Sequence, residues 1–216
     1  MAFEEYDKYE QSELVQKWLR ENGVSIVVGI AIGLVGIFGW QQWQRHQARD
    51  EANASQLYQQ ARIAQLSGKP EIASQLTDQL MKDYAKSPYA VFAVSDRARQ
   101  QVQDKQLDKA EASLEWAEGH AAEAPLKSLT LLRIAQVELA RDNGKAALAT
   151  LDRMPADSYQ GLTQELRGDV LVKLGRSDDA RKAYQTALST LGEEAPQRGA
   201  LQMKLDDLAA AGKQGA

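Results

Sequence analysis

The chain of 216 residues contains no cysteine, so it has no disulfide, no thiolate metal site and no cysteine nucleophile. This absence fits any cellular compartment. Charge of one sign is not in excess either, because 26 basic and 30 acidic side chains give a formal net charge of −4. Such a near-neutral surface argues against nucleic acid as a partner.

Residue patterns for catalysis are also missing. The sequence has no glycine-rich phosphate loop, no Gly-x-Ser-x-Gly and no His-Glu-x-x-His. Its two histidines, His46 and His120, lie far apart in the repeat scheme below, and acidic pairs such as Asp178-Asp179 are typical of solvated helix ends. We therefore expect no enzymatic activity, no metal site and no cofactor.

Proline is scarce, and no segment alternates apolar and polar residues as a strand does. The prolines fall at expected helix starts or turns, namely Pro70, Pro88, Pro125, Pro155 and Pro196. The sequence thus predicts an all-α protein, with a single N-terminal transmembrane helix followed by a tetratricopeptide-repeat-like α-solenoid, as argued next.

One apolar stretch, residues 24–40, carries no charge. As a helix it rises about 25 Å, the short end of what spans a bilayer, and residues 41–43 can add a turn at the headgroups. We expect a transmembrane helix over residues 24–43 with the lipid bilayer around it. A buried core helix and a cleaved signal peptide are the alternatives, although Gln-Gln-Trp-Gln-Arg-His follows the stretch where a cleavage site would need small residues.

Small residues lie along one side of this stretch, where another transmembrane helix could approach closely. They are Ser25, Gly29, Gly33 and Gly36. Glycine is also simply common in such helices, which is the alternative explanation. Basic residues are nearly balanced on the two sides, so charge does not orient the helix. Before it, we expect residues 1–23 to hold a short amphipathic helix with Leu14 and Val15 on its apolar side, ending at Asn22-Gly23.

A repeat follows the apolar stretch. Small residues twelve positions apart form four pairs, Ala61 and Ala73, Ala98 and Ala110, Ala135 and Ala147, and Gly168 and Ala180. Four positions after each pair stand Thr77, Leu114, Leu151 and Tyr184. Turn signals lie between the two members of each pair, at Gly68-Lys69-Pro70, Asp104-Lys105-Gln106, Asp142-Asn143-Gly144 and Gly175-Arg176-Ser177.

This pattern is typical of tetratricopeptide repeats, helix-turn-helix units of about 34 residues that stack into a solenoid. We expect units at about 54–86, 88–121, 126–155 and 160–191, a sealing helix at 196–209 and a disordered tail at 210–216. Because neither glycine nor proline occurs between Trp40 and Leu66, we expect the spanning helix to continue into the first unit. An irregular helical bundle is the alternative.

The inner face of a curved solenoid is lined mainly by the first helix of each unit. By register, its candidate binding residues are Tyr58, Arg62, Ser95, Arg99, Val102, Gln136, Leu139, Glu165, Asp169, Val172 and Lys173. Such a mixed lining suits an extended peptide or a partner protein better than a small molecule. Packing or solvation alone is the alternative role for each of these residues.

The chain resembles the YfgM-like ancillary subunit family of the bacterial SecYEG translocon. The resemblance depends on Glu21-Asn22-Gly23, Gly39-Trp40-x-x-Trp43-x-x-His46-Gln47, Ser55-x-x-Tyr58 and Gly68-Lys69-Pro70. It implies a single-pass protein of the cell inner membrane with a cytoplasmic N-terminus and a periplasmic repeat domain. It further implies association with SecYEG and the membrane-anchored chaperone PpiD, and the transfer of unfolded secreted polypeptides to periplasmic chaperones.

Two other functions fit the same residues. One is a scaffold of another envelope complex, and the other is a regulator that acts through the acidic N-terminus.

Overall fold

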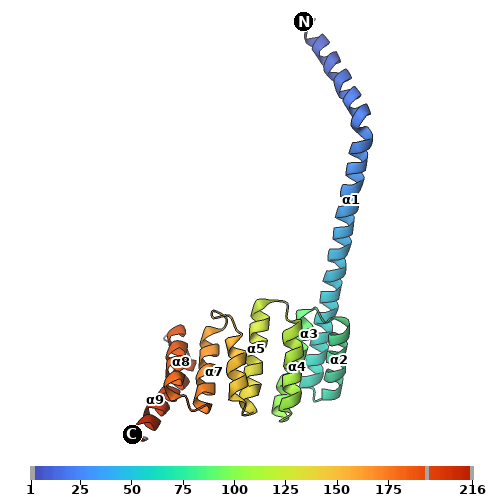
Figure 1. Cartoon of the computed structure of the whole chain (residues 1–216). Coiled ribbons are helices and arrows are strands. Elements are labelled where there is room, and N and C mark those ends of the chain that lie inside the picture. The colour runs from blue at the N-terminus through green and yellow to red at the C-terminus, as the bar shows by residue number, and fades with distance from the viewer. Residues whose placement is uncertain (1–2, 193–194, 215–216) are drawn as a thin grey trace. The chain divides into compact units, whose positions relative to one another are not determined.

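The computed structural model describes residues 3–192 and 195–214, with side chains for 16–25, 27–192 and 195–210. Over these ranges the chain is helical and contains no strand, which confirms the predicted all-α class. Contacts divide the chain into two units, Met1–Ala52 and Asn53–Ala216, and each is described by itself (Figure 1).

The first unit is the N-terminal part of α1 (Phe3–Leu66). This helix continues through Gly23, so the predicted helix end there is wrong. A glycine inside a helix costs about 1 kcal/mol but leaves the backbone hydrogen bonds intact. The side-chain amide of Asn22 also donates to the Trp18 carbonyl oxygen, at 3.0 Å. Leu14 and Val15, on the predicted amphipathic stripe, lie outside the residues whose side chains are described.

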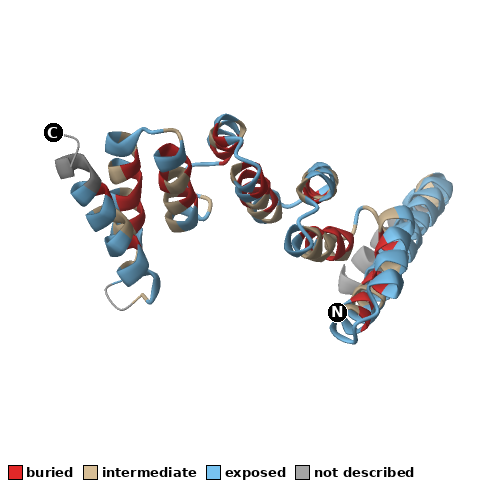
Figure 2. Ribbon diagram, turned by 90° about the horizontal axis from the view of Figure 1, so that it is seen from below, coloured by how far each residue is buried: buried red, intermediate tan, exposed pale blue. Residues whose placement is uncertain are grey.

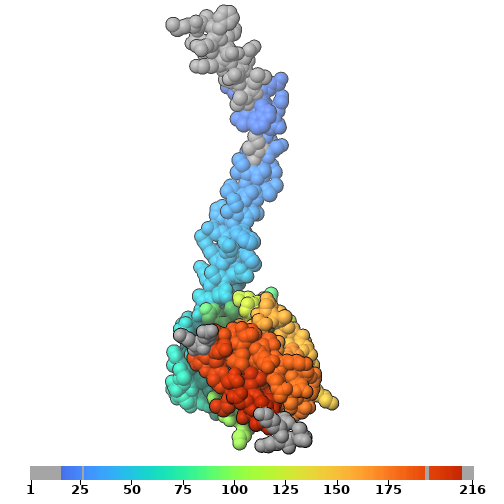
Figure 3. Space-filling view, turned by 90° about the vertical axis from the view of Figure 1, so that its left-hand side faces the viewer, coloured from blue at the N-terminus to red at the C-terminus, as the bar shows by residue number. Residues whose placement is uncertain are grey.

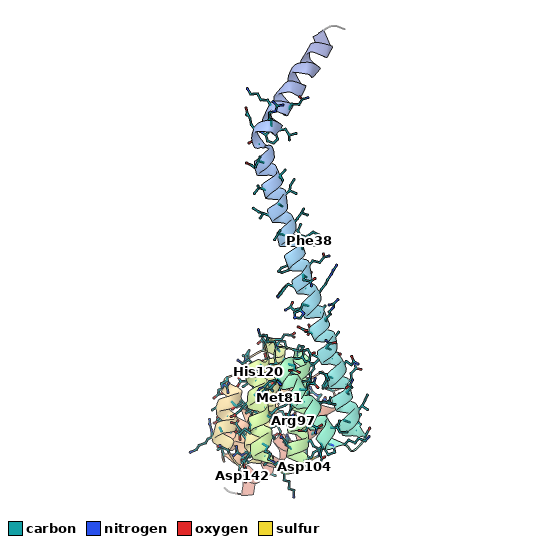
Figure 4. All side chains as sticks on the ribbon, turned by 90° about the vertical axis from the view of Figure 1, so that its right-hand side faces the viewer. Phe38, Met81, Arg97, Asp104, His120 and Asp142 are labelled. Carbon is teal, nitrogen blue, oxygen red and sulfur yellow. The ribbon has the colours of Figure 1, made fainter. Side chains whose placement is uncertain are left out.

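Large apolar side chains of the first unit are exposed, with Val24 at 78% and Phe38 at 66% (Figure 4). No single helix of the described residues meets the length and hydropathy requirements for a membrane span. The pair Gln16–Ser25 and Val27–Leu66 meets them together, by length and composition, with a bend of 44° between its members.

The second unit is built of helical hairpins. Its helices after α1 are α2 (Pro70–Asp83), α3 (Pro88–Gln103), α4 (Leu107–His120), α5 (Ala124–Ala140), α6 (Gly144–Asp152), α7 (Gln160–Lys173), α8 (Ser177–Thr190) and α9 (Gln197–Gln214). The end of α1 packs on α2, and α3 pairs with α4, α5 with α6 and α7 with α8, while α9 packs on α8. Figure 2 shows the buried residues on the sides that neighbouring helices turn toward one another.

Each hairpin closes on the predicted small residues, all of which are buried. Small side chains let the two helix backbones approach, and a larger residue one turn later fills the groove beside them, such as Leu114 in α4 or Leu151 in α6. The last hairpin has Gly168 at its crossing because a Cβ there would overlap the ring of Tyr184. In the first hairpin Thr77 stands at the position of Leu114, Leu151 and Tyr184, and its hydroxyl donates to the Ala73 carbonyl oxygen at 2.8 Å.

The turn inside each hairpin passes through one residue with positive φ. These residues are Gly68 (69°), Lys105 (58°), Asp142 (62°) and Gly175 (73°). The next amide donates to the carbonyl oxygen five residues back, as from Gln106 to Gln101 at 2.7 Å, which satisfies the end of the first helix. Asp104 and Asp142 lie at one edge of the second unit and His120 at the opposite edge (Figure 4).

Helix α9 covers the last hairpin, where Leu201 and Leu208 join the apolar cluster around Tyr184 (Figure 3). It continues to Gln214, past residue 209, so residues 210–214 are helical and not the predicted disordered tail. The alanines at 209–211 explain this, since alanine has the highest helix propensity. Residues 215 and 216 lie outside the described residues.

Replacing Lys105 by glycine is expected to stabilise the protein by about 0.5–1 kcal/mol, because a side chain in the left-handed region costs free energy that glycine avoids. Urea unfolding of the full chain, followed by helical circular dichroism, measures the change. Gly175→Ala is the matched control at the equivalent turn and is expected to lower stability by about 1 kcal/mol. Its Cβ meets no atom within 4 Å, so backbone strain alone acts. A lower midpoint for Lys105→Gly would contradict this account.

Candidate binding groove

Two adjoining cavities lie along the first helices of the second unit. The α1–α3 cavity, of about 140 Å³, lies between α1, α2 and α3, and the α3–α5 cavity, of about 230 Å³, lies between α3, α4 and α5. Asp96 and Arg99 line both. We call the two cavities together the groove.

The α1–α3 cavity is bridged by polar contacts between first helices. Tyr58 donates its hydroxyl to Asp96 Oδ2 at 3.0 Å, and the Gln65 amide donates to Gln100 Oε1 at 2.8 Å. Burial, and then the neighbouring Asp96 carboxylate, raise the pKa of Tyr58. The Arg62 guanidinium lies 5.9 Å from the centre of the Tyr58 ring. These contacts set the spacing of α1 and α3.

Arg97 fixes the other wall of this cavity. Its Nη2 donates to the Ser74 carbonyl oxygen at 2.9 Å and to Asp78 Oδ1 at 2.7 Å. Its Nη1 lies 3.6 Å from the sulfur of Met81, and Figure 4 shows the two side chains together. Arg97 is therefore a structural tie between α2 and α3.

The α3–α5 cavity has apolar walls and a charged rim. Its lining residues are Ser95, Asp96, Ala98, Arg99, Val102, Leu114, Arg133, Gln136, Val137 and Ala140. Arg99 Nη2 donates to Asp96 Oδ1 at 2.8 Å. Ser95 is 4% exposed, and its hydroxyl oxygen has no hydrogen-bond partner among the described residues. This hydroxyl oxygen is enclosed by protein atoms, so it is a buried unsatisfied group and not a site that a ligand reaches.

The α7 end of the predicted face is already occupied by protein contacts. Lys204 of α9 donates to Glu165 Oε1 at 3.0 Å and to Asp169 Oδ1 at 2.7 Å. The Tyr184 hydroxyl also donates to Asp169 Oδ1, at 2.7 Å. Burial first, then the hydrogen bond to Asp169, raise the pKa of Tyr184. Burial alone would lower the pKa of Lys204, but its bonds to the two carboxylates raise it overall.

The structure therefore brings together only part of the predicted set. Tyr58, Arg62, Ser95, Arg99, Val102 and Gln136 line the groove. The other five do not line either cavity. Leu139 is half-buried against the α5–α7 core, Val172 is exposed, and Lys173 pairs with Asp142 at 2.5 Å.

Sequence reasoning missed three groups beside the groove. Asp96 and Arg133 line it from the same register position, 37 residues apart, so the repeat itself was the signal that could have found them. Tyr89 and Phe92 form an aromatic cluster with Tyr58, with ring centres 6.0–6.1 Å apart, and Phe92 is 36% exposed. Only the packing of α3 on α1 brings these rings together.

The predicted packing face of α1 is bare in this structure. A Cβ at Gly29, Gly33 or Gly36 would meet nothing within 4 Å, and Ser25 is exposed. In the part of the chain that the structure describes, no cluster of three or more His, Cys, Asp or Glu side chains could hold a metal ion.

Helical hairpins that close on small residues every 33–37 positions, with a groove along their first helices, define a tetratricopeptide-repeat-like protein. Consistent with this class, residues 16–210 match the tetratricopeptide repeat-like domain family. The chain belongs more particularly to the family of ancillary SecYEG translocon subunits.

Relatives of that name cover most of the chain. The protein from Escherichia coli (strain K12) is 30% identical over 181 residues, which are 84% of this chain and 87% of the relative. The one from Haemophilus influenzae is 30% identical over 208 residues, 96% of this chain and 100% of the relative. The one from Neisseria gonorrhoeae is 26% identical over 204 residues, 92% and 97% respectively. The predicted resemblance is confirmed.

The second unit is expected to lose stability as the pH rises above about 10. Tyr184, whose ordinary pKa is 10.0, and Lys204, whose ordinary pKa is 10.5, both have raised pKa values in the folded protein. The folded state therefore holds protons that the unfolded state releases, and the difference opposes folding at high pH.

Urea midpoints of the full chain between pH 8.5 and 11.5 measure this effect. Tyr184→Phe keeps the ring and removes the titrating hydroxyl, so its midpoint is expected to fall less steeply above pH 10, with Lys204 and Tyr58 causing what remains. Parallel curves for the two proteins would show that Tyr184 does not contribute.

Proposed function

We propose that this chain is a non-enzymatic, membrane-anchored subunit of the Sec translocon that binds secreted polypeptides as they emerge and passes them to periplasmic chaperones. The family supports the place of action, since its members are named ancillary SecYEG translocon subunits. The groove supports the binding role, and it is the single observation that carries it.

The proposal of a membrane anchor is supported by the exposed apolar side chains of α1. From Val24 to Trp40 the large apolar side chains that the structure describes are about half to three-quarters exposed, and this stretch has no charge. Burying apolar surface is worth about 25 cal/mol per Å², so such a helix is stable only when something apolar covers it. The hydrocarbon of a bilayer does so over the predicted 24–43 segment.

The groove suits an extended chain. It runs across three consecutive first helices, combines apolar walls with arginine and aspartate, and has about 140 Å³ and 230 Å³ of space in its two parts. Extended polypeptide offers both apolar side chains and main-chain polar groups to such a surface. Stacked helical repeats commonly use such an extended concave surface for binding.

The remaining proposal concerns topology and partners. In the proposed topology the N-terminus lies in the cytoplasm and the repeat unit lies in the periplasm, on the other side of the inner membrane. The bare side of α1 at Gly29 and Gly33 is the contact for a helix of SecYEG or of the chaperone PpiD, because absent side chains allow backbones to approach in lipid.

The anchor predicts that the full chain stays in the membrane pellet after extraction with alkaline carbonate. Tags at the two termini should then react from opposite sides of the membrane, the N-terminal one only after the inner membrane is opened. A protein found in the supernatant, or trimmed near Trp43, would refute the anchor.

The helix contact predicts that a photoreactive residue at Gly29 or Gly33 crosslinks to translocon or PpiD helices in native membranes. Phe38 lies on the opposite side of the helix by its spacing of nine residues from Gly29, so a probe there is the matched control and should label lipid. Equal labelling of lipid from all three positions would refute the proposed helix contact.

Purification from mild detergent separates the other two functions. Recovery of a different envelope complex in place of SecYEG would favour the scaffold. Deletion of residues 2–11, with the anchor kept, would favour the regulator if it altered an envelope stress response while secretion stayed normal.

A further inference from the structure

We infer that the groove selects extended segments that carry an aliphatic side chain and a carboxylate on the same face, two residues apart. This inference rests on the proposed function, because it names the class of polypeptide that the groove would bind. It follows from two observations on the groove, which are the size of the α3–α5 cavity and the charge of the side chains that line both cavities.

The size of the α3–α5 cavity suits an aliphatic side chain. A cavity of about 150 Å³ in a protein core accepts a benzene molecule, and this one holds about 230 Å³. Its deeper wall consists of Ala98, Leu114 and Val137, all buried. A leucine or isoleucine side chain therefore finds apolar atoms on several sides.

The charges of the groove select the sign of the neighbouring side chain. Four arginines and one aspartate line the two cavities, namely Arg62, Arg97, Arg99, Arg133 and Asp96. Arg97 pairs with Asp78 and Arg99 with Asp96. Arg62 and Arg133 pair with no carboxylate of the described residues, which leaves a positive excess of two. A guanidinium binds a carboxylate through two parallel hydrogen bonds, so an acidic side chain is preferred.

The preference for an acidic side chain applies to the groove and not to the α7 end of the same face. At the α7 end, Lys204 pairs with both Glu165 and Asp169, and these three side chains together keep a net charge of −1, which does not favour a further carboxylate. In an extended segment, residues i and i+2 point to the same face about 7 Å apart. An aliphatic residue in the α3–α5 cavity therefore places a carboxylate two residues away near the rim that carries Arg99 and Arg133.

Three labelled peptides of twelve residues test the inference, with the full chain in lipid nanodiscs. They share a Ser/Gly sequence and differ at the centre, which is Leu-Ser-Asp, Leu-Ser-Lys or Ala-Ser-Asp. Fluorescence anisotropy is expected to show the Leu-Ser-Asp peptide binding about tenfold more tightly than either of the others, and 0.5 M salt is expected to remove most of its advantage over Leu-Ser-Lys.

Two variants assign the effect to the groove. The double variant Arg62→Gln and Arg133→Gln should bind the Asp and Lys peptides equally. The control double variant, Lys109→Gln with Lys145→Gln, changes two exposed lysines of α4 and α6 and should keep the preference for the Asp peptide. Val102→Phe fills the α3–α5 cavity and should weaken both leucine peptides about tenfold. Val172→Phe, at the equivalent register position of α7, should not.

The outcomes separate the inference from the proposed function. Equal binding of the Asp and Lys peptides, or a preference that survives the double arginine variant, would overturn the inference; sensitivity to Val102→Phe would then still support a polypeptide groove. If no peptide binds and Val102→Phe leaves crosslinking to emerging chains in membranes unchanged, both fail.

Discussion

The close crossing of paired helices at alanine and glycine is the constraint on which the second unit depends. At Ala98 and Ala110, for example, both residues are fully or almost fully buried, and any larger side chain would hold the two helices apart. Because the same spacing recurs at each hairpin, successive hairpins stack in the same way. The first helices then line up beside one another, and the groove is what remains between them.

The row of first helices differs at its two ends in how far its charged and apolar side chains have partners within the chain. At the α7 end, α9 places Lys204 between Glu165 and Asp169, and its leucines cover the cluster around Tyr184. Both carboxylates there have an ion-pair partner within the chain, and the apolar surface is covered. Around α3, by contrast, Arg62 and Arg133 line the groove without a carboxylate partner among the described residues. The groove of the proposed function therefore lies on the part of the face that α9 does not cover.

The two units of the chain differ in how far their apolar side chains are covered. The hairpins bury their apolar side chains against one another, as at Leu114 and Leu151. The stretch from residue 24 to 40 leaves its apolar side chains uncovered by the described residues. In the proposed function a bilayer provides that cover, and the hairpins remain free to offer their groove to a polypeptide.

The sequence by itself determined the helical class, the hairpin register and the turns, because these follow from local rules of spacing, from small residues at a fixed period and from turn residues in phase. It also predicted Tyr58, Ser95 and Arg99 on one face. It did not show that Asp169 is taken by Lys204 or that Asp96 bridges Tyr58 and Arg99. The contact of Lys204 with Asp169 joins residues 35 positions apart, and that of Tyr58 with Asp96 joins residues 38 positions apart, so only the packing of the helices decided these two contacts.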